Sequence, residues 1–226
     1  MWNGKNKALT FSYDDGISQD IRLVEILNKY GMKCTFNLNS GIMNEKGNFQ
    51  INDVPITRMT PEGLAELYRG HEIAVHTLTH PNLLELSDEE VRREIAEDKS
   101  ALESLFGCEI CGMAYPYGTF DERVIGIAKE CGIKYSRTVI DAPDFALQNN
   151  LMEFKATCHH RNPRVFELLD EFLAYKGDAP AMFCLWGHSY EFDVNNNWEL
   201  IEEFCKKASG HSDIFYGTNR EVLSGR

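Results

Sequence analysis

The chain has no long hydrophobic run, no excess of basic residues and no glycine-rich dinucleotide loop. No apolar stretch approaches the ~18–20 residues that a membrane helix needs, which argues against a membrane span. The 226 residues carry a formal net charge of −12. Nucleic acids and anionic membranes bind basic surfaces, so neither is an expected partner. The G-x-G-x-x-G pattern of dinucleotide-binding folds does not follow the first strand-like run.

The chain also lacks low-complexity segments, repeats and Pro/Gly/Ser linkers, so residues 1–226 are expected to form a single domain. The first residues, 1–7, have neither the apolar region nor the cleavage site of a secretion signal, and we expect a cytoplasmic protein. Seven scattered cysteines fit a reducing compartment. Cys108 and Cys111 form a lone CxxC without the second pair of a structural zinc site. We interpret them as incidental thiols flanking a strand, with a redox pair as the alternative.

Strand-like and helix-like segments alternate along the whole chain. Strands are expected at residues 7–12, 33–38, 72–76, 111–115, 134–138, 154–158, 181–186 and 213–216. Helices are expected at residues 18–30, from Thr60-Pro61 onward, and at 87–106, 121–131, 163–175 and 195–208. This alternation predicts a parallel sheet covered by helices, and the number of units favours an incomplete barrel over a doubly wound sheet. The polar segment 41–57 is expected to be an insertion loop or a hairpin.

Polar motifs follow four of the predicted strands. They are Asp14-Asp15, the segment from His76 to His80, Pro116-Tyr117-Gly118 and Gly187-His188. In a barrel of parallel strands, the carboxyl ends of the strands meet at one face. The four motifs are therefore expected to form one site.

Asp15, His76 and His80 form a candidate two-histidine, one-carboxylate site for a divalent metal such as zinc. The spacing of four would align the histidines on a helix, but Pro81 follows directly, so a loop at the strand exit is an equal alternative. Neighbouring side chains on extended backbone point in different directions, which leaves Asp14 free to act on a substrate beside the metal. The alternative role for Asp14 is a helix cap or turn former.

Three further histidines carry less specific signals. His188 follows a strand and is interpreted as a general acid rather than as a histidine satisfied by backbone hydrogen bonds. His159 and His160 could contact substrate or lie on the surface. Aromatic residues near His188 are more typical of core than of a sugar-stacking platform; they are Trp186, Tyr190, Phe192 and Trp198.

Taken in order, the motifs Ser12-Tyr13-Asp14-Asp15-Gly16, His76 to His80, Pro116-Tyr117-Gly118 and Gly187-His188 resemble those of the polysaccharide deacetylases, the NodB-like carbohydrate esterases. The resemblance extends from Leu9 to about Tyr216. It implies a distorted, incomplete (β/α)7-type barrel. It also implies the following roles: Asp14 as general base; Asp15, His76 and His80 as metal ligands; the Tyr117 backbone N–H in an oxyanion hole; and His188 as general acid.

Two positions depart from the family pattern. The family usually has an arginine two residues before the Pro-Tyr pair, where it orients the base, and this chain has Ala114 there. We hypothesise that Arg137, at the end of the next predicted strand, reaches the same carboxylate. The family's fourth motif, an acidic residue with a tryptophan, is matched only loosely by residues 141–145.

The implied activity is that of a metal-dependent deacetylase acting on linear amides other than peptide bonds. Its expected substrate is an N-acetylated (or O-acetylated) carbohydrate, such as a soluble oligosaccharide or glycoconjugate. Zinc is the first candidate metal, with cobalt, manganese and nickel as alternatives. The alternative functions are a non-catalytic carbohydrate-binding relative, a hydrolase of a non-sugar amide and, with the same ligand types but a different fold, a non-haem iron oxygenase.

Overall fold

A sheet of eight parallel strands forms the centre of the computed structural model, which describes residues 1–224. The strands are β1 (Lys7–Asp14), β2 (Cys34–Leu38), β5 (Glu72–Val75), β6 (Gly112–Ala114), β7 (Tyr135–Arg137), β8 (Cys158–His159), β9 (Ala181–Gly187) and β10 (Ile214–Tyr216). Their order is β7-β6-β5-β2-β1-β9-β8, and β10 pairs with the first half of β1. Within residues 1–224, the two end strands β7 and β8 do not pair with each other. The expected distorted, incomplete (β/α) barrel is thus confirmed.

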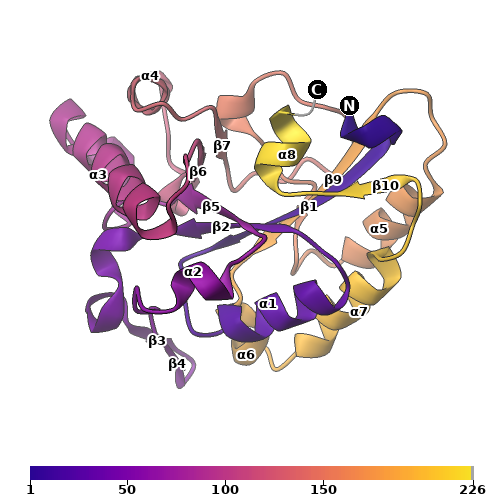
Figure 1. Ribbon diagram of the computed structural model, residues 1–226, viewed down its shortest axis with the longest axis horizontal. Coiled ribbons are helices and arrows are strands. Elements are labelled where there is room, and N and C mark those ends of the chain that lie inside the picture. The colour runs from indigo at the N-terminus through magenta and orange to yellow at the C-terminus, as the bar shows by residue number, and fades with distance from the viewer. Residues whose placement is uncertain (225–226) are drawn as a thin grey trace.

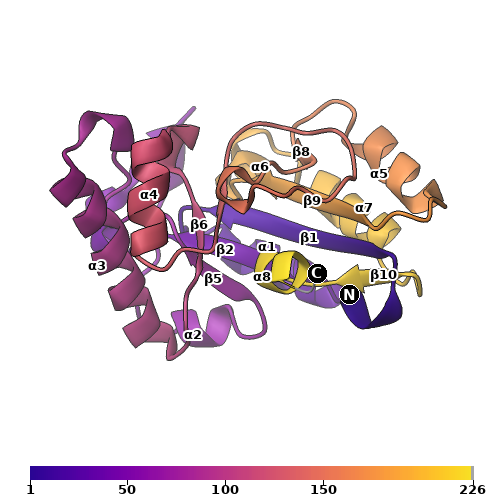
Figure 2. The same cartoon turned by 90° about the horizontal axis from the view of Figure 1, so that it is seen from above.

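Helices cover the sheet on both sides (Figures 1 and 2). They are α1 (Asp20–Lys29), α2 (Leu64–Leu67), α3 (Asp88–Phe106), α4 (Glu122–Glu130), α5 (Val165–Ala174), α6 (Tyr190–Val194), α7 (Trp198–Ala208) and α8 (Asn219–Ser224). Short 3-10 turns occupy Trp2–Gly4, Ser40–Ile42, Asn44–Gly47, Leu83–Glu85, Pro116–Gly118 and Leu151–Glu153. Both views place α3 beside α4 at one end of the molecule and α5 beside α7 at the other. Within residues 1–224, no helix is both long and apolar enough to cross a bilayer.

The central strand β1 is buried along its whole length. It pairs with β9 from Lys7 to Tyr13 on one side. On the other side it pairs first with β10, up to Leu9, and then with β2, from Phe11. One face of the strand places Leu9, Phe11 and Tyr13 in the core, and the other carries buried polar side chains that end at Asp14.

The predicted strand at 154–158 is wrong in extent, because residues 154–157 do not form a regular strand and instead connect the two open edges of the sheet. Phe154 N donates to Ser136 O on the β7 side (3.0 Å), whereas Thr157 N donates to Cys184 O on the β9 side (2.9 Å). The segment therefore crosses between the two open edges. Only Cys158–His159 forms a regular strand, β8, which pairs with β9.

Two helix predictions also need correction. Thr60 does not cap a helix, because Gly63 adopts a left-handed conformation (φ 80°) and α2 begins only at Leu64. The helix expected at 195–208 begins at Trp198, after a turn in which Asn196 has φ 48°. The separate helix α6 before that turn was not predicted.

Other local signals are confirmed. Ser87 and Glu90 form a reciprocal capping box at the start of α3, and Gly107 ends the helix in the left-handed conformation (φ 66°). Segment 41–57 contains an antiparallel hairpin of β3 (Phe49–Ile51) and β4 (Val54–Ile56). Its two turn residues, Asn52 and Asp53, both have positive φ, as a type I′ turn requires.

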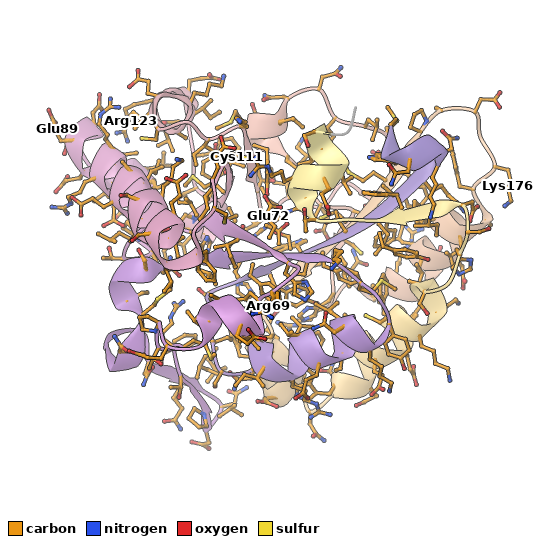
Figure 3. All side chains as sticks on the ribbon, in the orientation of Figure 1. Arg69, Glu72, Glu89, Cys111, Arg123 and Lys176 are labelled. Atoms are coloured by element: carbon orange, nitrogen blue, oxygen red, sulfur yellow. The ribbon has the colours of Figure 1, made fainter. Side chains whose placement is uncertain are left out.

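The CxxC cysteines lie away from the carboxyl ends of the strands. Cys111, labelled in Figure 3, directly precedes β6 and is buried, whereas Cys108 is exposed. All seven cysteines are free thiols. The interpretation of Cys108 and Cys111 as incidental thiols agrees with this placement.

A stability test follows from the packing of β9. Phe183 is fully buried and packs against the rings of Phe145, Phe172 and Phe204. Phe183→Ala should lower the free energy of unfolding by about 3–5 kcal/mol, because the cavity left behind cannot fully collapse. Ile21→Ala, at a position 46% exposed on α1, should change it by less than about 0.5 kcal/mol. Urea unfolding monitored by circular dichroism measures both, and equal effects would contradict the assignment of this core.

Candidate active site and metal centre

The carboxyl ends of β1, β5, β6 and β9 surround a cavity of about 420 Å³. Six of the residues predicted from the sequence line it: Asp14, Asp15, His76, His80, Tyr117 and His188. They come from segments up to 174 residues apart, counted from Asp14 to His188 (188 − 14). The expectation that the four motifs form one site is therefore fulfilled in space.

Asp15, His76 and His80 place one donor atom each within 4.8 Å of one another. His76 Nδ1 donates a hydrogen bond to the Ala114 carbonyl oxygen (2.8 Å), which leaves the lone pair of Nε2 free to bind a metal. Burial lowers the pKa of His76 to about 4 and also lowers the pKa of His80, so both imidazoles are neutral at neutral pH. Neutral imidazole and carboxylate are the forms that bind metal, and the group fits a divalent cation.

The two histidines lie on a loop and not on a helix. Thr77 and His80 adopt positive φ values of 68° and 59°. Two carboxylates from α3 hold this loop: Glu94 accepts from Thr79 N and Oγ1 (both 2.8 Å), and Asp98 accepts from His76 N (3.2 Å). These contacts position the imidazoles without the i, i+4 geometry of a helix.

Arg58 contacts Asp15 and was not predicted from the sequence. Its Nη1 lies 3.1 Å from Asp15 Oδ1, and it also donates to Asn39 Oδ1 (3.0 Å) and to the Asp15 carbonyl oxygen. Asp15 itself has φ 89°, at the sharp turn into Gly16. Arg58 lies just beyond the hairpin in a polar segment, and no motif marks it in the sequence.

Asp14 is buried, and both of its carboxylate oxygens accept hydrogen bonds. Its Oδ1 accepts from Asn37 Nδ2 (2.8 Å), and its Oδ2 accepts from Arg137 Nη2. Burial alone would raise the pKa of Asp14, but the charge and hydrogen bond of Arg137, together with the charge of His188, outweigh it and lower the pKa to about 2. Asp14 is therefore ionised throughout the neutral range.

The contact hypothesised for Arg137 exists. Arg137 is fully buried and also bonds to Ser12 Oγ (3.3 Å) and to the Thr138 carbonyl oxygen (3.1 Å). Ala114 and Arg137 are register partners in the β6–β7 pair. The guanidinium thus comes from the position on β7 that lies directly beside position 114 on β6, where the family usually has its arginine.

His188 faces Asp14 across the cavity. Its Nε2 lies 3.8 Å from Asp14 Oδ2, and its Nδ1 lies 3.4 Å from Glu191 Oε2. Burial lowers the pKa of His188, but its hydrogen bond to Glu191 and the charges of Asp15 and Asp14 raise it to about 9 overall. An ionised carboxylate and an imidazolium therefore stand side by side at neutral pH.

Tyr117 occupies the turn after β6. Its side chain is 65% exposed, and its ring packs edge-on against His80 with centroids 4.6 Å apart. The residue has φ 56°, and among residues 1–224 its backbone N–H donates to no protein acceptor. That N–H is therefore available for an external acceptor.

Comparison with known proteins now fixes the family. A family model described as polysaccharide deacetylase matches residues 3–136. The chain belongs to the polysaccharide deacetylase family. Chitin deacetylase 1 of Cryptococcus neoformans var. grubii is 32% identical over 124 residues, covering 54% of this chain and 23% of the relative. The peptidoglycan-N-acetylglucosamine deacetylase PgdA of Listeria monocytogenes is 26% identical over 147 residues, covering 64% and 28%.

The chain thus spans about a quarter of the length of these curated relatives. Among solved structures, a family 4 carbohydrate esterase from Streptomyces lividans in complex with acetate aligns with a TM-score of 0.60 at 16% identity. The alignment covers 95% of this chain and 93% of that one. This similarity establishes the fold.

Glu191 is a second residue of the site that the sequence did not reveal. Its Oε2 is approached by His159 Nε2 (3.0 Å), His160 Nε2 (3.2 Å) and His188 Nδ1 (3.4 Å). Burial would raise the pKa of Glu191, but these three contacts hold it far below its usual range. The buried His160 thus lies beneath the site and not on the surface.

His159, His188 and Glu191 also form a compact group of potential ligands, with donor atoms within 4.8 Å of one another. However, Arg161 N donates to His159 Nδ1 (3.1 Å), which assigns the ring proton to Nε2. A protonated Nε2 donates to Glu191 and has no lone pair for a metal. We conclude that this group is a hydrogen-bonded network that holds His188 in place.

Asp141, the first residue of the loosely matched fourth motif, contacts a residue of β9. Asp141 Oδ1 accepts from Trp186 Nε1 (2.9 Å), and Trp186 lines the cavity beside Tyr190. Trp186 is buried in a core cluster, as the core interpretation expected, and also lines the cavity, whereas Tyr190 is only half-buried. The core interpretation is also confirmed for Phe192 and Trp198, which are buried in the core.

The network around Glu191 predicts a shift of the basic limb of the pH profile. Glu191→Gln keeps an oxygen acceptor but removes the negative charge, so the pKa of His188 should fall. If His188 must be protonated to act, the basic limb of kcat/KM should move at least about one pH unit lower. The exposed Glu167→Gln on α5 is the matched control. An unchanged basic limb in Glu191→Gln would show that this carboxylate does not set the pKa of His188.

Proposed function

We propose that the protein is a metal-dependent deacetylase that hydrolyses the N-acetyl group of a carbohydrate. The observation that carries the proposal is geometric: Asp14 and His188 face each other in the cavity, with His188 Nε2 3.8 Å from Asp14 Oδ2, beside the candidate metal ligands. Asp14, whose pKa is lowered, and His188, whose pKa is raised, supply one base and one acid at neutral pH, as the hydrolysis of an amide requires. The family and its fold support the same reaction class.

Asp15, His76 and His80 would hold the metal, with zinc as the first candidate and cobalt, manganese or nickel as alternatives. The chemistry that such a cation supplies when bound is Lewis acidity, which lowers the pKa of water and polarises a carbonyl oxygen. That chemistry matters here because a carboxylate of low pKa, such as Asp14, is a weak base.

The chain's own residues account for the proton movements. Asp14 takes a proton from the water that attacks the acetyl carbonyl carbon. The Tyr117 N–H donates to the oxygen on which negative charge develops. His188 then gives its proton to the departing nitrogen, because an amide anion is a poor leaving group. Water is added across the C–N bond, and the products are acetate and a free amino sugar.

The substrate class follows from charge and from the relatives. The net charge of −12 disfavours a polyanion. The two curated relatives are named as deacetylases of chitin and of N-acetylglucosamine in peptidoglycan. We infer an N-acetylated sugar in a soluble oligosaccharide or glycoconjugate, and an O-acetyl ester would fit the same site. Seven free cysteines support a reducing, cytoplasmic location.

A non-catalytic carbohydrate-binding protein is the main alternative. A binding protein has no need to bury an ionised aspartate against a fully buried arginine, since burying two charges is costly. The retained pair of Asp14 and Arg137 therefore favours catalysis.

The role of Arg137 is tested by substitution. Arg137→Ala, together with Arg137→Met to preserve packing, should lower kcat by about 10²-fold or more, because the base loses the charge that orients and ionises it. Metal affinity, measured by isothermal titration calorimetry, should change little. Arg93→Ala, exposed on α3, is the control. Full activity in both Arg137 variants would contradict the role of Arg137 in orienting Asp14.

The reaction itself is tested by acetate release from N-acetylglucosamine oligosaccharides and aryl acetates, with and without a chelator. The metal-loaded protein should release acetate from a sugar amide, and chelation should abolish the release. Asp14→Asn should reduce the rate by about 10²–10⁴-fold. Asp170→Asn, exposed on α5, should leave the rate unchanged. Stoichiometric metal binding with no release from any substrate would contradict a carbohydrate deacetylase.

A further inference from the structure

The β3–β4 hairpin forms one wall of the catalytic cavity. The hairpin is a separate two-stranded sheet that does not join the central strands (Figure 1). Phe49 at its start and Arg58 just beyond its end both line the cavity. The wall is therefore an addition to the barrel and not one of its βα units.

The base of the hairpin is tied to the loop that carries Asp15. Ser18 N donates to Thr57 O, and Met59 N donates to Gly16 O (both 2.9 Å). Arg58 reinforces this connection, because its Nε donates to Gly47 O (3.3 Å) while its Nη1 contacts Asp15. The wall thus has a fixed position beside the catalytic carboxylates.

The hairpin also contacts α6, on the far side of His188. The ring of Phe49 meets the ring of Tyr190 edge-on, with centroids 5.6 Å apart. We call this pair the Phe49–Tyr190 clasp. Gln19 Nε2 donates to Asp193 Oδ2 (3.0 Å), which holds α6 against the loop at the base of the hairpin. The clasp closes the rim between the hairpin and the end of β9.

The opposite rim is more exposed, because Tyr117 and Val139 are 65% and 41% exposed, whereas Phe49 and Tyr190 are half-buried. Tyr117 and Val139 line the cavity on the side of β6 and β7. The lining residues therefore come from the exits of β1, β5, β6, β7 and β9, and from the hairpin and α6. A volume of about 420 Å³ lies at the lower end of the range for small-molecule pockets.

An internal unit of a polysaccharide has a neighbouring sugar on each side, and both neighbours must leave the cavity. A terminal unit has one neighbour and needs one exit. We propose that the Phe49–Tyr190 clasp restricts this enzyme to the terminal N-acetylated sugar of an oligosaccharide or glycoconjugate. The inference rests on the proposed deacetylase function and adds the position of the sugar that is deacetylated.

The test compares N-acetylglucosamine substrates of increasing chain length. The metal-loaded protein is given N-acetylglucosamine disaccharide, hexasaccharide and soluble glycol chitin, and mass spectrometry locates the free amine in the hexasaccharide. The free amine should appear at a chain end only, and kcat/KM per acetyl group should be at least about tenfold lower on glycol chitin than on the disaccharide.

Phe49→Ala should open the clasp and raise the ratio of internal to terminal deacetylation. A second variant, in which residues 50–55 are replaced by a two-residue turn, should do the same. Gln50→Ala, exposed on the same strand, is the matched control and should keep the wild-type ratio. Circular dichroism of each variant confirms folding.

The outcomes separate the two proposals. Acetate release from none of the sugars would overturn the deacetylase function. Release from internal units by the wild-type protein would overturn the terminal restriction while leaving the deacetylase function standing. A terminal restriction that persists in both hairpin variants would show that the clasp is not its cause.

Discussion

The buried contact between the Asp14 carboxylate and the Arg137 guanidinium links the chemistry of this protein to its fold. Asp14 ends the central strand β1, and Arg137 ends the edge strand β7, with β2, β5 and β6 between them in the sheet. The two groups can meet only if the sheet curls. The charge of Arg137 also keeps Asp14 ionised at a depth where burial alone would favour the neutral acid. Loss of the curl would separate the pair and leave two unpaired charges in the core, which is strongly unfavourable.

The same electrostatic logic gives the neighbouring groups different protonation states. Burial acts on Asp14, His76 and His188 alike, yet the pKa of His76 falls to about 4 and that of His188 rises to about 9. The difference comes from their partners. His76 donates to a neutral carbonyl group, whereas His188 faces Glu191 as well as Asp14. His76 is thereby neutral, the form in which imidazole can bind a cation, whereas His188 carries a second proton.

Much of this arrangement could be predicted from the sequence because the motifs follow strands, and strand ends converge by topology. Asp14, Asp15, His76, His80 and His188 were found in this way. Glu191 and Arg58 were not, since each acts through a contact made by an element that lacks a sequence motif: the short helix α6 and the segment after the hairpin. Asp141 and Trp186 are 45 residues apart and meet only across the gap in the barrel. Short-range patterns carry no information about such contacts.

Arg137 reaches Asp14 from a different backbone position than the one at which the family usually has an arginine. Position 114, where the family usually has this residue, holds alanine, whose carbonyl oxygen orients His76. The guanidinium comes instead from Arg137, its register partner on the next strand. Because parallel strands lie about 4.8 Å apart, an arginine side chain can span one strand and deliver the same charge to the same carboxylate. The requirement is therefore a cation at a point in space, and the sheet offers more than one backbone position from which to supply it.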